Sequence, residues 1–393
     1  MRTSMVGLAV LGLVLSSGCT RSRTPSRDGS VVRLDGATPD GGRDAGPPPC
    51  PVDVDEVDLL LMVDNSNSMS EEQTSLAVQF PRLVRVLATG DLDGDGVEDF
   101  VPVRSLQVGV VSSDMGTGGH RVPTCSEPGF GDDGVLRTTG NTMITGCLAT
   151  YPPFLGFRPA DGADPDAFAA DVSCVATIGT GGCGFEQQLE AVLKATTPST
   201  SSIAFHMDTS GHADRENMGF LRPDSLLAVV LVTDEEDCSA ADPELFSPSS
   251  SVYTGELNLR CFNFPVAVHP VARYVEGLVA TRTSPDLLLY AAIAGVPPRL
   301  VEGREVVDFN AILTDPEMQE MIDPTLPTRL RPSCNVPGRG LAFPPRRMVQ
   351  VGREIEARGG NAVVQSICQA DFSPAVDAIL GRIARRLRND CRR

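Results

Sequence analysis

Residues 57–69 read Val-Asp-Leu-Leu-Leu-Met-Val-Asp-Asn-Ser-Asn-Ser-Met, a short apolar run that ends abruptly in polar residues. A continuous apolar run of this length, without alternation, is typical of a strand buried on both faces in a parallel sheet. In open α/β sheets, ligands bind just past the carboxyl ends of the strands. Asp64, Ser66 and Ser68 stand there at two-residue spacing, so extended backbone points their oxygens to one side. Three hard oxygen donors suit a magnesium or calcium ion.

This D-x-S-x-S pattern after an apolar strand resembles the metal-ion-dependent adhesion site of von Willebrand factor A (vWA) domains. Two further segments resemble other parts of that site and follow in the family's order. Residues 179–190 look like the loop that supplies a threonine, together with the helix after it. Residues 226–234 look like the fourth strand with its terminal aspartate. The resemblance covers roughly residues 55–390, with long insertions.

The resemblance implies a magnesium ion, or manganese or calcium in its place, held by the hydroxyls of Ser66, Ser68 and Thr180. Asp64 and Asp234 are implied to contribute directly or through water. A hydroxyl-rich set of ligands leaves a cation underneutralised, so an open position attracts a carboxylate. The implied partner is therefore a protein that offers an Asp or Glu side chain. The alternative is a polar loop that binds no metal.

The resemblance also predicts an α/β, Rossmann-like vWA domain over residues 51–393, with a mainly parallel central sheet flanked by helices. Apolar runs predict strands at 57–63, 105–111, 226–233, 287–294 and 361–367, and periodicity predicts helices at 69–88, 185–195, 269–281, 346–358 and 373–388. We place the third strand at 174–178. Stretches without sustained periodicity predict disulfide-pinned loop insertions at about 112–173, 235–268 and 296–344.

Residues 1–19 have the features of a secretory signal peptide. Arg2 gives a positive start, an apolar run follows, and small residues precede Cys19. Small residues directly before a cysteine resemble a bacterial lipobox, which implies lipidation of Cys19. Because Leu15 lies one position further from the cysteine than is usual, cleavage by a general signal peptidase is the alternative. The apolar run is well short of the ~20 residues that span a bilayer.

The lipobox-like signal, together with the residues that follow it, predicts a lipid-anchored protein of the bacterial cell envelope. Residues 20–50 are rich in Gly, Pro and Asp, which predicts a flexible tether between membrane and domain. By resemblance to lipoproteins that lack an aspartate after the lipidated cysteine, Thr20 favours the outer membrane over the inner. The domain would then face either the periplasm or the cell surface.

The protein is strongly acidic, with a formal net charge of −18. Nucleic-acid binding is disfavoured, since neutralising phosphates requires a basic face. The excess of acid instead keeps the local potential negative, which helps a cation site. Glu235 and Glu236 follow Asp234 directly and could widen the cation site, but we favour a solvated loop, because such side chains are mostly exposed.

The 11 cysteines become an even set of ten when Cys19 is reserved for lipid. An even number in an exported protein predicts five disulfides. Zinc binding is disfavoured, since no C-x-x-C pair occurs. Connectivity cannot be derived from spacing, and pairing of neighbours gives the hypothesis Cys125–Cys147, Cys174–Cys183, Cys238–Cys261, Cys334–Cys368 and Cys50–Cys391.

An acidic stretch at residues 91–99 indicates a second cation site. Asp91, Asp93 and Asp95 with the following glycine match the first half of an EF-hand loop, in which the glycine permits a sharp turn. The twelfth position is Pro102, so the bidentate glutamate is missing. Short calcium loops of thrombospondin-repeat type look similar and close with an aspartate such as Asp99. Carboxylate density favours calcium, and a solvated acidic turn is the alternative.

Enzymatic function is not expected. No H-E-x-x-H, Walker or G-x-S-x-G motif occurs, and the four histidines lie in no recognisable catalytic motif. Residues 179–184 fit a dinucleotide fingerprint, but export and a cysteine inside the loop argue against a nucleotide. The favoured hypothesis is a binding module that engages a partner carboxylate through a divalent cation. The alternatives are a structural envelope lipoprotein that uses no metal for binding and, less favoured, a metal-assisted hydrolase.

Overall fold

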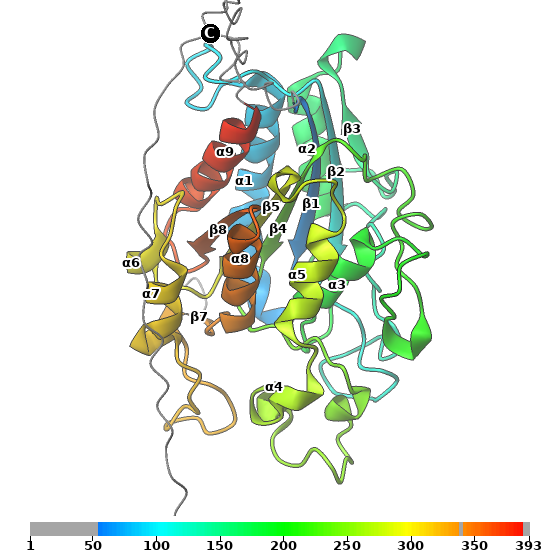
Figure 1. Ribbon diagram of the computed structural model, residues 1–393, viewed down its shortest axis with the longest axis vertical. Helices are drawn as coiled ribbons and strands as arrows, with labels where there is room; N and C mark the ends of the chain where they lie inside the picture. The colour runs from blue at the N-terminus through cyan, green and yellow to red at the C-terminus, as the bar shows by residue number, and fades with distance from the viewer. Residues whose placement is uncertain (1–53, 338–340, 388–393) are drawn as a thin grey trace, which may run out of the picture. The chain divides into compact units, whose positions relative to one another are not determined.

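A six-stranded, mainly parallel sheet forms the centre of the domain (Figure 1). The computed structural model describes residues 54–337 and 341–387. The strand order is β3-β2-β1-β4-β5-β8, and every neighbouring pair is parallel except β2 with β3. The strands are β1 (Glu56–Val63), β2 (Ser105–Ser112), β3 (Leu155–Phe157), β4 (Leu226–Val232), β5 (Leu288–Ala294) and β8 (Asn361–Ser366). The predicted α/β class is confirmed.

Helices cover both faces of the sheet (Figure 1). One face packs against α1 (Ser70–Thr89), α2 (Pro165–Ala176) and α9 (Ser373–Leu387). The other face packs against α3 (Gln188–Thr196), α5 (Val271–Val279) and α8 (Arg346–Ala357). These helices lie within a few residues of the predicted ranges, except that α2 was not predicted.

Burial on both faces explains why β1 is continuously apolar from Leu59 to Val63. Leu59, Leu61 and Val63 belong to the core under α1, α2 and α9, whereas Leu60 and Met62 belong to the core under α3, α5 and α8. All five side chains are fully buried. Alternation of side chains along these five residues therefore fills both cores at once, and none of the five faces solvent.

The predicted third strand at 174–178 is wrong. The observed third strand is β3, a three-residue edge strand antiparallel to β2, and residues 174–176 form the last turn of α2. Phe168, Ala169, Val172, Val175 and Ala176 are buried at helical spacing. Asp164 caps this helix by accepting a hydrogen bond from the Asp166 N–H, and Pro165 occupies the first turn. The predicted 112–173 insertion thus contains a strand and most of a helix.

The other predicted insertions contain short elements rather than long helices. Residues 296–344 contain α6 (Pro298–Val301), α7 (Phe309–Thr314) and the small hairpin of β6 (Cys334–Asn335) and β7 (Leu341–Ala342). A third hydrophobic cluster fixes α6 and α7 to residues of β8 and α8. Residues 235–268 contain α4 (Arg260–Asn263). Isolated 3₁₀ turns are Asn67–Met69, Pro159–Asp161, His206–Asp208, Pro243–Phe246, Leu257–Leu259, Pro265–Ala267, Pro285–Leu287 and Pro316–Met318.

Four disulfides join the described residues, and two of them correct the predicted pairing. Cys238–Cys261 and Cys334–Cys368 form as predicted. The predicted Cys125–Cys147 and Cys174–Cys183 pairs are wrong, because the bonds are Cys125–Cys183 and Cys147–Cys174. The physical reason is that α2 carries Cys174 to the 141–151 loop, where the Asn141 N–H donates to the Cys174 carbonyl.

Several sequence-based predictions lie outside the described residues. They are the signal segment 1–19 with the lipidated Cys19, the tether 20–50 and the Cys50–Cys391 disulfide. Among the residues that the structure describes, no helix combines the length and the apolar character needed to cross a membrane.

A buried ion cluster fixes the amino-terminal half of β1. Asp58 is completely buried, and the Arg222 Nε donates to its Oδ1 at 2.7 Å. The Ser225 hydroxyl donates to Oδ2 at 2.5 Å, and Arg282 lies 3.4 Å from the same oxygen. Burial raises the pKa of Asp58, while Arg222 opposes the shift. Asp58 thus supplies the counter-charge of the buried Arg282, and it shares the half-buried Arg222 with Glu56, which lies 3.2 Å from that guanidinium.

We expect Asp58→Ala to destabilise the domain by roughly 3–5 kcal/mol, because it leaves the buried Arg282 without its counter-charge and removes the buried partner of Arg222. Equilibrium urea unfolding measures this loss. Arg104→Ala is the matched control, since Arg104 makes an exposed ion pair with Asp55 at 2.9 Å and its removal should change stability little. A similar effect of the two substitutions would contradict the structural role of the buried cluster.

Candidate functional site

The candidate site lies at the carboxyl end of β1, where Asp64 connects three neighbouring strands. Asp64 is fully buried, and its Oδ2 accepts a hydrogen bond from the Thr233 hydroxyl, which follows β4, at 2.6 Å. Its Oδ1 accepts one from the Ser113 hydroxyl, which follows β2, at 3.2 Å. The Ser66 N–H donates to the same Oδ1 at 2.8 Å. Asp64 is therefore held rigidly behind the loop that carries the two serines.

In front of Asp64, three oxygen-bearing side chains form a continuous series. The hydroxyls of Ser66 and Ser68 lie 3.0 Å apart. The Ser68 hydroxyl donates to Asp234 Oδ1 at 3.2 Å. Ser66 and Asp234 are buried, whereas Ser68 is exposed. The structure thus brings together Ser68 and Asp234, which are 166 positions apart in the sequence, and the exposed Ser68 lies in the middle of the series.

The loop that contains Thr180 lies against the Asp64–Asn65 segment. The Gln73 side-chain amide donates to the carbonyls of both Asp64 and Gly179, in each case at 2.7 Å. The Gly182 N–H donates to the Asn65 carbonyl at 2.8 Å. A Cβ at Gly182 would lie only 2.1 Å from the Asn65 side chain, so a larger residue here would have to displace the Asn65 amide. Thr180, half-buried, stands between these two contacts.

Sequence reasoning missed the residues that support the site. Thr233 and Ser113 end their strands as Asp64 does, so the rule applied to β1 identifies them when it is applied to β4 and β2. Gln73 stands nine residues after Asp64, on the first helix, and only the folded structure shows its role. Gln188 donates to the Thr233 hydroxyl at 2.8 Å, which fixes that hydroxyl toward Asp64.

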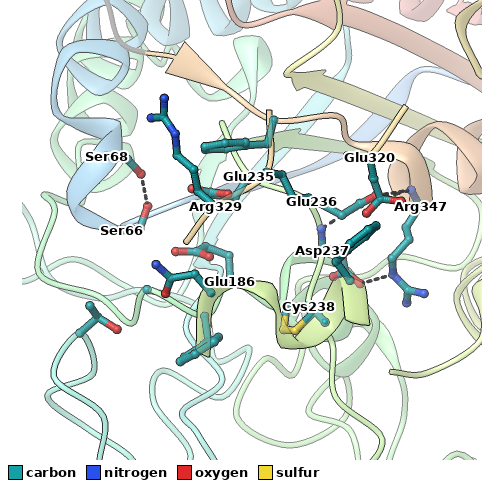
Figure 2. Close-up of a pocket in the computed structure, with 18 of the residues that line it drawn as sticks. Ser66, Ser68, Glu186, Glu235, Glu236, Asp237, Cys238, Glu320, Arg329 and Arg347 are labelled. Carbon is teal, nitrogen blue, oxygen red and sulfur yellow. Dashed lines mark hydrogen bonds and ion pairs between the residues drawn. A yellow bond between two sulfur atoms is a disulfide. The ribbon is translucent and has the colours of Figure 1, made fainter. Parts of the chain in front are cut away.

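A cavity of about 340 Å³ adjoins Ser66 and Ser68 (Figure 2). Its acidic lining residues are Glu186, Glu235, Glu236, Asp237 and Glu320. Figure 2 shows Glu186 and Glu235 between the serine pair on one side and Glu236 and Asp237 on the other. The cavity therefore extends the candidate site from the two serines to the loops that follow β4.

Contrary to expectation, Glu235 and Glu236 are half-buried rather than solvated. Glu236 accepts a hydrogen bond from the Arg347 backbone N–H at 2.9 Å. The neighbouring Asp237 pairs with the Arg347 guanidinium at 3.0 Å and accepts from the Leu189 N–H at 2.9 Å. Both acids stabilise the cavity wall. Glu236 holds α8 to the loop after β4, and Asp237 holds both α8 and α3 to the same loop.

The acids of the site have raised pKa values. Burial raises the pKa of Asp64, and it raises the pKa of Glu186 and of Asp234 well above the ordinary range. The charges of neighbouring acids add to the shifts at Glu186 and Asp234. Burial, followed by the charge of Asp64, raises the pKa of Glu235 to about 8, while Arg329 opposes the shift. A divalent cation would relieve this accumulation of negative charge.

The predicted calcium loop places three of its four aspartates together. Carboxylate oxygens of Asp91, Asp93 and Asp99 lie within 4.8 Å of one another. Asp91 accepts hydrogen bonds from the N–H groups of Gly94 and Gly96, at 2.7 and 2.9 Å. Asp95 is not in this group, and its Oδ1 accepts from the Val97 N–H at 2.8 Å. Asp91 and Asp99 close the loop across its ends, as the spacing indicates.

Comparison with known proteins does not assign the chain to a family. No protein-family model matches it, and no curated protein matches it. Among solved structures, it is similar to an aspartate-to-alanine mutant of the PilB minor pilin from Streptococcus sanguinis, with 8% sequence identity and a TM-score of 0.39. The match covers 87% of this chain and 63% of the pilin chain, so this chain spans less than two thirds of the pilin. A similarity of this size defines neither a fold family nor a function.

The raised pKa of Glu235 predicts how stability depends on pH in the presence of a chelator. Because the folded carboxyl keeps its proton up to about pH 8 and the unfolded one loses it near pH 4.5, stability should fall as pH rises through this window. Glu235→Gln removes this titration, so the variant should lose less stability between pH 5 and pH 8. Urea unfolding at several pH values measures the difference. Equal pH dependence in both proteins would contradict the raised pKa.

Proposed function

We propose that this protein is a binding module of the vWA kind that engages a protein partner through a divalent cation, most simply magnesium. The observation that carries the proposal is the series of oxygens from Ser66 through Ser68 to Asp234 at the carboxyl end of the central strands. Asp64, behind this series, and Thr180, on the neighbouring loop, complete the proposed set of ligands.

The residues present fit such an ion. Hydroxyl and carboxylate oxygens are the ligands that magnesium and calcium prefer, and the series contains no nitrogen or sulfur side chain. The buried Asp64 accepts hydrogen bonds from three different residues, which fixes its orientation before any ion binds. Accumulated acid supplies the negative potential that attracts a cation.

The exposed Ser68, in the middle of the series, indicates how a partner would bind. A bound cation would supply an open coordination position at the surface, and an Asp or Glu side chain of the partner fits that position. Ser68 is exposed, so a partner can reach the site without rearrangement of the buried Asp64. We propose that a cation bound by the proposed ligands, together with the exposed position at Ser68, selects a carboxylate on another protein, and that no reaction follows.

The proposal includes the cell envelope as the place of action. A secretory signal with Cys19 in a lipobox-like context supports display on a lipid anchor, with the outer membrane favoured. Four disulfides among the described residues support maturation in an oxidising compartment. A tethered binding module would meet its partner at the membrane surface.

Magnesium binding tests the proposal. Isothermal titration of soluble protein that starts at Thr20, with acetate supplied as the carboxylate, should show one magnesium site. Ser68→Ala should weaken its affinity by about tenfold or more, because the variant loses a direct ligand. Asp64→Ala should abolish binding.

Ser70→Ala is the matched control for this experiment. Ser70 is also exposed and lies two positions further on, but its hydroxyl donates to Glu71 rather than to the series. The control should bind magnesium as wild type does. If wild type fails to bind magnesium with acetate present, the cation-dependent mechanism is wrong and a structural role becomes the better explanation.

We propose a separate calcium ion at Asp91, Asp93 and Asp99. Asp91→Asn should weaken calcium binding, since one of the three gathered carboxylates loses its charge. The magnesium affinity of the same variant should stay at the wild-type value, because the acidic loop and the Ser66–Ser68 site are distinct. Calcium and magnesium titrations of one preparation measure both. Unchanged calcium binding in Asp91→Asn would contradict this second site.

A further inference from the structure

The cavity beside Ser66 and Ser68 contains a carboxylate that the fold leaves without a partner. Glu186 lines the cavity and is only 7% exposed. Among the described residues, no other residue forms a hydrogen bond or an ion pair with the Glu186 side chain. Glu235 lines the same cavity and also lacks such a partner among the described residues. A buried, unpaired carboxylate is costly, so its retention in a cavity indicates a ligand of opposite charge.

Neither arginine of the cavity pairs with Glu186, because both guanidinium groups are engaged elsewhere, although the charge of Arg329 acts on Glu235. Arg329 pairs with Asp323 at 3.1 Å. Arg347 pairs with Asp237 at 3.0 Å and donates to the His269 carbonyl at 2.7 Å. Figure 2 shows the Arg347 guanidinium on the side of the cavity away from Glu186. The fold therefore neutralises one wall of the cavity and leaves the wall that carries Glu186 acidic.

The lining favours an organic cation over a second metal ion. Within the parts of the chain that the structure describes, the groups of three metal-ligating side chains do not include Glu186 or Glu235. Phe185, Phe262 and Phe343 line the cavity together with the Cys238–Cys261 disulfide. Aromatic and sulfur surfaces suit the flat guanidinium of arginine, which stacks on rings and donates to carboxylates at its edge. A volume of about 340 Å³ also exceeds what a bare ion occupies.

We propose that this cavity binds a basic side chain of the partner, arginine in the best case, with Glu186 as its main acceptor and Glu235 beside it. The inference rests on the proposed function, because it places the basic residue next to the carboxylate that would bind at Ser66 and Ser68. The partner surface then carries an acidic and a basic side chain close together. The partner's acidic side chain would bind at the Ser66 and Ser68 site, and its basic side chain would enter the cavity.

The test uses N-acetyl-L-arginine amide as the probe and N-acetyl-L-citrulline amide as its neutral control of nearly the same shape. Both are titrated into the isotope-labelled, disulfide-intact protein in magnesium, and amide chemical shifts report binding. Arginine amide should give saturable shifts at residues 184–186 and bind at least about tenfold more tightly than citrulline amide, since the control lacks the positive charge that strengthens the hydrogen bonds to the carboxylates. Glu186→Gln should weaken arginine amide by a similar factor.

Glu302→Gln is the matched variant, because it removes one exposed negative charge away from the cavity and should leave the affinity unchanged. Glu235→Gln provides a second cavity variant if Glu186→Gln fails to fold. If arginine amide gives no saturable shift, or binds Glu186→Gln and wild type equally, the inference is overturned, while magnesium binding would leave the proposed function standing. If arginine amide binds in this pattern and magnesium does not, the cavity stands and the cation-dependent function falls.

Discussion

The hydrogen bonds of the Asp64 carboxylate are the constraint on which the rest of the site depends. They exist because β1 lies between β2 and β4 in parallel register, which brings the carboxyl ends of three strands to one edge of the sheet. Ser113 and Thr233 reach Asp64 from the two neighbouring strands. Any shift of one strand would break these contacts and also misplace the helices, because both faces of β1 are packed. The register of the sheet therefore determines the geometry of the site.

The buried carboxylates at the two ends of β1, Asp58 and Asp64, have opposite surroundings. At Asp58, arginines from two different loops neutralise a carboxylate that is completely enclosed, which suits a purely structural role. At Asp64 the neighbouring groups are hydroxyls, and burial together with the charges of Asp64 and Glu235 raises the pKa values of the acids beyond it, Asp234 and Glu186. A fold selected for stability alone would pair these acids as it pairs Asp58. The unpaired end is therefore where binding is expected.

The sequence predicted the elements with strong local signals and missed those that depend on the folded context. The long strands and the main helices were predicted nearly to the residue, because burial on two faces or on one face leaves a clear pattern. β3 was missed because three residues with an exposed central Gly156 leave no such pattern. The 174–178 run misled because the last turn of a buried helix is as apolar as a strand. Glu186 could not be identified from the sequence, because an acidic residue in a loop is usually solvated. Only the folded structure shows that this carboxylate is buried and has no partner of opposite charge in the described part of the chain.

The disulfides at the rim have a practical consequence for anyone who produces this protein. Cys125–Cys183 and Cys238–Cys261 hold a small cluster of loop residues that packs outside the two main cores. Because the sheet and its helices contain their own cores, we expect them to form even when the two rim disulfides stay open, as in a reducing cytosol. Such a preparation would have a normal helix and strand signal in circular dichroism yet lack the walls of the cavity. Expression in an oxidising host allows these disulfides to form. A free-thiol assay before any binding study then distinguishes a protein that does not bind from one whose disulfides are incomplete.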